Sequence, residues 1–243
     1  MTTVRAIVKI RMLLYVMDVD SLSIISSEGD EPRRSKGQSS RTAILLTAAK
    51  LATTKGLTGL SLGDLATEIG MSKSGLYAHF KSKEELELAT IETAAMIFDR
   101  EVLQPAMKAQ AGTERLKTLA SSFLSHLERR VFPGGCFFAS VAAELDTRPG
   151  PARDRVVEIS GNWLALLRQC ILEAQDLGEI DPNTEVDQAV FEIESMLLAG
   201  NFLFVMMNDP IYLTQARRGV ENVLTRLTVR AEPKKKRSAR GMP

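Results

Sequence analysis

Cysteine and histidine are scarce in this 243-residue chain, which has only two of each. Cys136 and Cys170 form no CxxC motif and belong to no cluster of cysteine and histidine, which excludes a disulfide framework and a structural zinc site. Both thiols stand among apolar neighbours, so we expect small core residues in a reducing cytoplasm. The sequence therefore predicts no metal and no cofactor.

Catalytic motifs are missing as well. The two histidines, His79 and His126, do not stand near a nucleophile motif. The chain also has no glycine-rich phosphate loop and no metal-ligand spacing. These absences exclude the common classes of enzyme, and we predict a protein without catalytic activity.

Long hydrophobic runs are not found, because no segment approaches the apolar length of a membrane span. Residues 6–19, AIVKIRMLLYVMDV, come nearest to a signal peptide, but Lys9 and Arg11 interrupt them and no convincing cleavage site follows. We interpret this stretch as a weakly structured leader, with Met12 and Met17 as alternative start residues. The sequence thus predicts a cytoplasmic protein with no membrane partner.

Charge is present in both signs, but it is unevenly distributed behind a formal net charge of +1. Residues 33–83 contain nine Lys and Arg against two Asp and Glu, whereas residues 84–229 contain thirteen against twenty-two. A basic segment can contact phosphates, and an acidic remainder is repelled by them. We therefore expect a DNA-reading domain attached to a second domain with a different role.

Residues 61–86, SLGDLATEIGMSKSGLYAHFKSKEEL, have the pattern of a helix-turn-helix followed by a third helix. Ser61 with Asp64 has the spacing of a capping box, in which side chains satisfy the free amides of a helix start. Gly70 suits the left-handed position just past a helix end. The pattern predicts helices near residues 62–69 and 73–80.

The second of these helices carries small and cationic side chains that suit a DNA groove. Lys73 and His79 can meet phosphates, and the Tyr77 hydroxyl can reach a phosphate or a thymine methyl. The hydroxyls of Ser72 and Ser74 can exchange hydrogen bonds with base edges. A serine-rich amphipathic helix in a small bundle would have a similar composition, so the neighbouring motifs have to support the DNA-reading interpretation.

Only helices are expected elsewhere, because no segment has the strict alternation of a half-buried strand. A second capping box, Ser82 with Glu85, opens a lever helix that we expect to run unbroken over residues 83–103 and to stop before Pro105. A third, Thr184 with Asp187, opens a later one. The other expected helices span residues 40–54, 113–131, 136–145, 152–177, 184–207 and 212–230. The predicted fold class is all-α, with a three-helix DNA-binding domain joined to a larger helical domain.

Residues 41–88 resemble the DNA-binding domain of TetR family transcriptional repressors. The resemblance rests on Gly56, on Gly70-Met71-Ser72, and above all on Leu76-Tyr77-x-His79-Phe80-x-Ser82-Lys83-Glu84-x-Leu86, while Ser61 stands where the family usually has Thr. The roles that the resemblance implies are phosphate contacts by Ser61, Tyr77, His79 and Lys83, base-facing positions for Ser72, Lys73, Ser74 and Gly75, and flanking backbone contacts by Arg41 and Thr42.

Beyond about residue 105 the likeness is confined to length, helical content and layout. It implies a homodimer that pairs through helices 184–207 and 212–230, and hence a palindromic operator whose half-sites lie about 34–36 Å apart. It also implies a pocket for a small apolar or aromatic effector. The candidate lining residues are Phe98, Phe123, His126, Phe137, Phe138, Asn162, Trp163, Leu167, Met196 and Phe202. A plain packed core would use the same side chains.

The expected function is that of a ligand-responsive dimeric repressor, in which the effector tilts the lever helix and releases double-stranded DNA. The alternative is a constitutive DNA-binding or activator protein whose C-terminal domain only dimerises. The expected divisions are a flexible extension 1–38, a DNA-binding domain 39–84, a ligand-binding and dimerisation domain 85–230, and a disordered basic tail 231–243. The basic arm at 33–36 could follow a DNA groove or remain a solvated tail.

Overall fold

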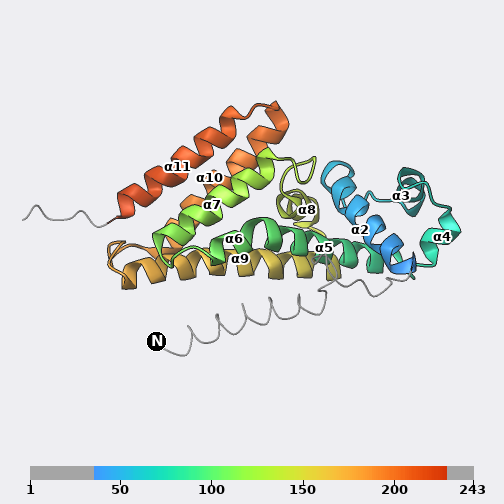
Figure 1. Cartoon of the computed structure of the whole chain (residues 1–243), viewed down its shortest axis with the longest axis horizontal. Coiled ribbons are helices and arrows are strands. Elements are labelled where there is room, and N and C mark those ends of the chain that lie inside the picture. Colours follow the sequence, from blue (N-terminus) through green and yellow to red (C-terminus); the bar gives the residue numbers. More distant parts are fainter. Residues whose placement is uncertain (1–35, 229–243) are drawn as a thin grey trace, which may run out of the picture.

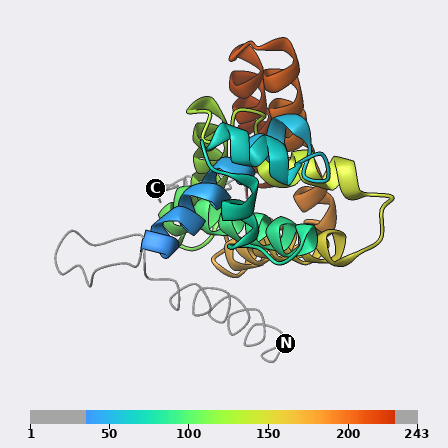
Figure 2. The same cartoon turned by 90° about the vertical axis from the view of Figure 1, so that its right-hand side faces the viewer.

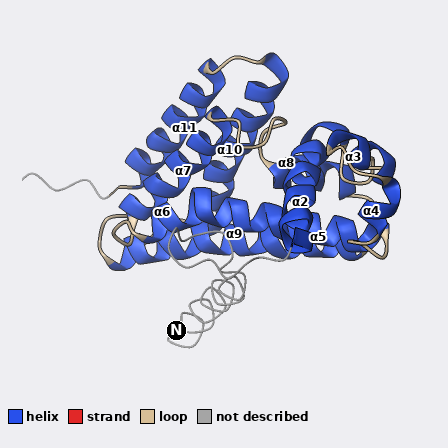
Figure 3. Ribbon diagram, turned by 45° about the vertical axis from the view of Figure 1, so that its right-hand side comes forward, coloured by secondary structure: helices blue, strands red, loops and turns tan. Residues whose placement is uncertain are grey.

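The computed structural model describes residues 36–228, and this part of the chain is built from helices (Figures 1 and 3). Within these residues the β contacts are limited to one isolated bridge between Ile180 and Thr228. The helical elements in chain order are α2 (Lys36–Lys55), α3 (Leu62–Glu68), α4 (Lys73–Tyr77), α5 (Lys83–Phe98), the π-helical segment η1 (Asp99–Leu103), α6 (Gln104–Met107), α7 (Thr113–Glu128), α8 (Phe137–Leu145), α9 (Pro151–Asp176), α10 (Val186–Met207) and α11 (Ile211–Leu227). The predicted all-α fold is confirmed.

Helices α2, α3 and α4 gather at one end of the molecule, and Figure 2 looks onto this end. The Ser61 hydroxyl accepts a hydrogen bond of 2.9 Å from the amide of Asp64, so the predicted N-cap opens α3. Gly70 follows α3 with a φ of +67°, a left-handed conformation that costs glycine little. These local signals fix a tight turn between α3 and α4, and the buried side chains of Ile44, Leu65 and Phe80 form the core beneath it.

The lever helix is not a single α-helix, which corrects the prediction for residues 83–103. An α-helical part ends at Phe98, and the next turn is π-helical, with the Gln104 amide donating to the carbonyl of Asp99. This wider turn places Pro105 in the first turn of α6, where its missing amide removes no helical hydrogen bond. The helical path therefore continues past Pro105 to Met107.

The remaining helices form the larger part of the molecule. Helices α5 and α9 run side by side along its length, while α7, α10 and α11 pack together at an angle to them (Figure 1). The short α8 contacts both α2 and α9, so it joins the three-helix end to the rest. One connected hydrophobic core runs through all of these elements.

Several predicted boundaries differ from the structure. Helix α2 begins at Lys36, three residues inside the predicted flexible extension, and the predicted division between residues 84 and 85 falls within the first turn of α5. Thr184 does not cap α10: Glu185 occupies the N-cap position, with no side-chain hydrogen bond there. The rest of the extension, most of its basic arm, and the tail lie outside the described residues.

Helix α10 corrects the prediction that no segment has membrane-spanning character. By length and composition alone it could cross a membrane, with a mean hydropathy of 1.6. In the fold, however, Ala189, Ile193, Leu197 and Phe204 on this helix are buried, and α10 packs on α7, α9 and α11. Only 33% of its apolar stretch is buried in this way, and other apolar side chains of the helix, such as Phe202, are exposed among the described residues.

Candidate DNA interface and ligand cavity

The exposed face of α4 carries the side chains that the sequence assigned to DNA. Ser72, Lys73 and Ser74 are exposed, and Tyr77 is 55% exposed. Leu76, on the opposite face, is fully buried and anchors the helix to the core. The Ser72 hydroxyl accepts from the amide of Gly75 at 3.1 Å, which caps α4. A short helix is thus presented with its polar side outward.

Ser61 and Lys73 converge although they begin different helices. A Cβ built on Gly63 would lie 3.3 Å from the Lys73 ammonium and 3.6 Å from the Ser61 hydroxyl, so both groups border the same small space. A hydroxyl donor and an ammonium side by side are suited to one phosphate oxygen. A side chain at residue 63 would occupy this space.

Gly75 is explained by local packing. A Cβ at this position would lie 3.2 Å from the Ser72 hydroxyl and 3.4 Å from the Met71 methyl, both tight contacts. Glycine therefore protects the cap of α4, in addition to any close approach to DNA. This reason differs from the contact with a base or sugar that the sequence suggested.

Arg41 connects three helices of the DNA-binding domain, and its side chain remains 37% exposed. Its guanidinium donates to the carbonyl of His79, stands 3.4 Å from the Glu85 carboxylate and covers the Phe80 ring at 4.3 Å from the ring centre. These contacts tie α2 to the end of α4 and the start of α5. Arg41 thus positions the reading helix, and its contact with the DNA backbone stays a prediction, because a guanidinium has five N–H donors and these contacts leave some of them unused.

The other predicted phosphate contacts have mixed surroundings. Lys83 is exposed, but its ammonium donates to the carbonyl of Thr58 and stands 3.7 Å from the Glu87 carboxylate. Thr42 and the His79 side chain are half-buried. The structure therefore brings Ser61, Lys73 and Tyr77 to the surface most directly.

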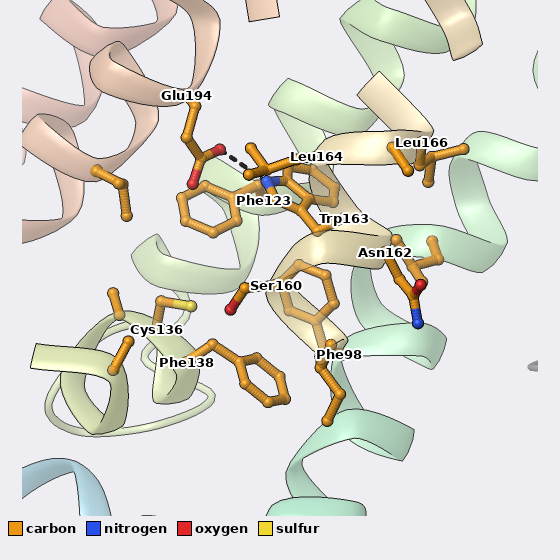
Figure 4. Close-up of a pocket in the computed structure, with 16 residues that line it drawn as sticks. Phe98, Phe123, Cys136, Phe138, Ser160, Asn162, Trp163, Leu164, Leu166 and Glu194 are labelled. Carbon is orange, nitrogen blue, oxygen red and sulfur yellow. Dashed lines mark hydrogen bonds between the residues drawn. The ribbon is translucent and has the colours of Figure 1, made fainter. Parts of the chain in front are cut away.

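A cavity of about 390 Å³ lies in the larger helical part, between α5, α7, α8, α9 and α10 (Figure 4). Its walls are almost entirely apolar, and Leu164 and Leu198 at its edge are 40% and 41% exposed. A volume of this size matches a small organic molecule. The cavity is thus a candidate ligand site with a side that opens toward the surface.

Five of the ten predicted lining residues border this cavity: Phe98, Phe123, Phe138, Asn162 and Trp163. The other five do not. Phe137 and Leu167 are buried core residues, and His126 is buried behind Phe98 with both ring nitrogens lacking a hydrogen-bond partner. Met196 and Phe202, on the outer face of α10, are 38% and 60% exposed, because the helix turns them away from the cavity.

Trp163 and Glu194 supply the main polar contact of the cavity. The indole Nε1 donates to Glu194 Oε2 at 2.7 Å, and Figure 4 shows this hydrogen bond as a dashed line from the nitrogen edge of the ring. Burial raises the pKa of Glu194, and the tryptophan hydrogen bond opposes this shift. Cys136 also lines the cavity, but burial raises the pKa of its thiol to about 11, so it is uncharged and poorly reactive at neutral pH.

Comparison with known proteins identifies both halves of this arrangement. Residues 44–90 match the bacterial regulatory proteins of the tetR family, and residues 112–220 match the tetracyclin repressor-like C-terminal domain. The chain belongs to the TetR family of transcriptional regulators. TetR regulators are DNA-binding proteins rather than enzymes, in agreement with the prediction from the sequence.

Individual TetR regulators are similar to this chain in structure or in sequence. A TetR regulator structure from Chloroflexus aurantiacus J-10-FL has 25% identity and a TM-score of 0.74, over 79% of this chain and 98% of that one. The structure of AibR in complex with isovaleryl coenzyme A and operator DNA has 23% identity and a TM-score of 0.61, over 77% and 97%. The repressor DhaR of Mycobacterium sp. (strain GP1) is 22% identical over 52% of this chain, and the match spans 62% of its length.

Glu144 joins the two parts of this TetR regulator, and sequence reasoning missed it. From α8 it accepts hydrogen bonds from the amides of Leu57 at 2.6 Å and Thr58 at 2.9 Å, in the turn between α2 and α3. The loop before α8 also lies against the end of α2, because a Cβ on Gly134 would stand 1.9 Å from the Thr53 carbonyl oxygen. The opposite side of α8 borders the cavity through Phe138.

Glu194 was also missed, although the sequence holds a signal for it. It lies four residues after Val190 and three before Leu197, and so on the same buried face of α10 as these two side chains. A carboxylate on a buried helix face requires a partner. The signal for Glu144 is weaker, because its partners are backbone amides that no sequence pattern marks.

Proposed function

We propose that this TetR regulator is a ligand-responsive dimeric repressor that binds a palindromic operator and releases it when a small effector occupies the cavity. One observation carries the proposal. The cavity is bordered by both elements that reach the DNA-reading end, α5 through Phe98 and α8 through Phe138. A ligand that changes the packing of these helices would change the placement of α4.

The response requires only that the effector bind the DNA-free arrangement more tightly than the DNA-bound one. Filling the cavity would press on Phe98 directly before the π-helical segment, where α-helical hydrogen bonding is interrupted. A shift of a few ångströms would misplace one reading helix on its half-site. Each lost phosphate contact then weakens operator binding and reduces the salt dependence of that binding.

Pairing of two copies is supported by the outer faces of α10 and α11. Large apolar side chains are exposed there, among them Phe191 (68%), Phe202 (60%) and Met206 (58%). These three positions recur at helical spacing on α10, and an exposed apolar stripe of this kind is typical of an interface between protein chains. Two copies joined through this face would present two α4 helices, about 34–36 Å apart, to successive major grooves of operator DNA in the cytoplasm.

The first test is selection of bound duplexes from a random DNA library by the purified full chain. We expect enrichment of an inverted repeat, because a two-fold dimer reads two equivalent half-sites. Failure to enrich any sequence would contradict the proposal. The effector part is tested separately: a compound that raises the melting temperature should also release the selected DNA. Stabilisation without release would favour the constitutive DNA-binding or activator alternative.

Lys73→Ala tests the reading helix. Its ammonium is exposed beside Ser61, so we expect a loss of about 1–3 kcal/mol in specific operator binding. Fluorescence polarisation with the selected duplex measures this loss. Lys117→Ala on α7 removes the same charge from an exposed position in the larger domain, and it should leave binding nearly unchanged. Equal effects of both variants would mean that Lys73 acts only through net charge.

A further inference from the structure

Glu194 is the one charged residue among those that line the cavity. It projects from the middle of α10, and no Lys or Arg within residues 36–228 forms an ion pair with it. Its single hydrogen bond comes from the neutral indole of Trp163. A carboxylate can accept about four hydrogen bonds, so most of its capacity is unused.

Aromatic rings form the walls beside this carboxylate. The ring centres of Phe98 and Trp163 are 5.5 Å apart at 86°, and those of Phe98 and Phe138 are 5.9 Å apart at 88°. Phe123 stacks on Trp163 at 6.2 Å and 26°. In each right-angled pair the edge of one ring meets the face of the other, and a ring face left open toward the cavity attracts a cation.

The Glu194 carboxylate and the aromatic walls together discriminate between classes of ligand. An anionic ligand would meet the Glu194 carboxylate and no lining cation. A neutral apolar ligand would remove water from Glu194 without replacing it, which is unfavourable for a charged group. A ligand with one positive charge and an apolar body satisfies both the carboxylate and the aromatic walls.

We propose that the effector is a lipophilic monocation, an organic amine or quaternary ammonium compound, whose charged head lies between Glu194 and the aromatic rings. This inference rests on the proposed effector role of the cavity and names the chemical class of its ligand. Glu194 supplies the charge selectivity, and Trp163 holds the carboxylate in place. The apolar remainder of the cavity, toward Leu164 and Leu198, takes the uncharged part of the ligand.

The test compares two probes of the same shape, the cation phenyltrimethylammonium and its neutral isostere tert-butylbenzene. Trp163 is the only tryptophan in the chain, so its fluorescence reports binding at this cavity in the unaltered full-length protein. We expect the cation to bind at least about tenfold more tightly than the isostere. Equal binding, tighter binding of the neutral probe, or no binding of either would overturn the proposal.

Glu194→Gln sharpens the test because glutamine keeps an oxygen for the Trp163 hydrogen bond and loses the charge. We expect the cation to bind at least about tenfold more weakly to this variant, and the neutral probe to change by less than about threefold. Glu185→Gln, an exposed position at the start of the same helix, is the matched control and should alter neither affinity. If the two variants behave alike, Glu194 is not the recognition group.

The failure of this inference is separable from that of the proposed function. Release of the selected operator duplex is measured in parallel with fluorescence. If the cation binds selectively but leaves the duplex bound, the site stands and the ligand-responsive function fails. If a neutral compound binds and releases DNA while the cation does not, the function stands and the monocation proposal is overturned.

Discussion

The DNA-reading end and the cavity of this TetR regulator are both built from helices, but they are held together differently. In α3 and α4 the decisive hydrogen bonds join residues three apart, such as Ser61 with Asp64 and Ser72 with Gly75. In the cavity the decisive contact joins Trp163 on α9 with Glu194 on α10. A reading surface can be made locally, whereas an enclosed site requires several helices to meet.

The two regions also differ in the sign and the exposure of their charged side chains. Exposed cations such as Lys73 stand on the reading end, where water and DNA can solvate them. The cavity holds one carboxylate among aromatic rings, where burial penalises its ionised form unless a cation compensates the charge. Charge provides affinity for phosphates in the first region; under the proposal above, it discriminates between ligands in the second.

The largest expected effect is the loss of dimerisation. It tests whether the DNA affinity of the reading end depends on the larger domain. Phe202→Asp places a charge on the exposed apolar face of α10 and should prevent dimerisation. Loss of the second half-site should weaken operator binding by about 10²–10⁴-fold. Light scattering and fluorescence polarisation measure the two results. Val157→Asp, at a 54% exposed position on α9, should retain both properties; a dimeric Phe202→Asp protein would place the interface elsewhere.

The second effect is a pH dependence of folding stability that arises in the larger domain alone. Burial lowers the pKa of His126 from 6.5 to about 4. Between these pH values the unfolded chain binds a proton that the folded chain does not, so stability falls as pH falls. The loss is complete below about pH 4 and on the order of 3 kcal/mol.

Urea unfolding of the wild type and of His126→Leu over this pH range isolates this contribution. Carboxylates contribute to the pH dependence of both proteins, so only the difference between them reports on His126. We expect the variant to lose less stability on acidification. Parallel pH profiles would show that the imidazole is hydrated in solution.

The third effect is a loss of local stability in the turn between α2 and α3. It tests how much Glu144 contributes to the connection between the two regions. Glu144→Gln replaces a charged acceptor of the Leu57 and Thr58 amides with a neutral one, and we expect a loss of about 2 kcal/mol in the stability of the α2–α3 turn. Hydrogen exchange of these two amides measures it. Asp146→Asn, at an exposed position next to α8, is the control. Unchanged exchange in Glu144→Gln would mean that Glu144 does not stabilise this turn, and that α5 and the contact of Gly134 with α2 couple the regions.

The smallest effect concerns Lys83, whose ammonium the structure engages with the carbonyl of Thr58. If it also meets a phosphate, Lys83→Ala should reduce the salt dependence of binding by about one unit of slope and weaken binding to all sequences alike. Salt titrations of operator and random duplexes measure this. An unchanged slope would assign Lys83 a purely structural role in the turn.

The sequence by itself determined the features that depend on neighbours along the chain. Caps at Ser61 and Ser82 and the left-handed Gly70 were all readable, because each involves residues within a few positions. The same local rules failed where tertiary contacts compete. Thr184 caps no helix, and the helical path continues through Pro105 by means of a π turn.

Only the tertiary structure decided which side chains form the cavity and which lie outside it. Phe98 and Phe202 are both aromatic residues on long apolar helices, yet one lines the cavity and the other faces outward. The partners of Trp163 and Leu57 lie 31 and 87 residues away. Helical periodicity determines which residues share a face, but the burial of that face depends on how the helices pack, and that packing is set by contacts distant in sequence.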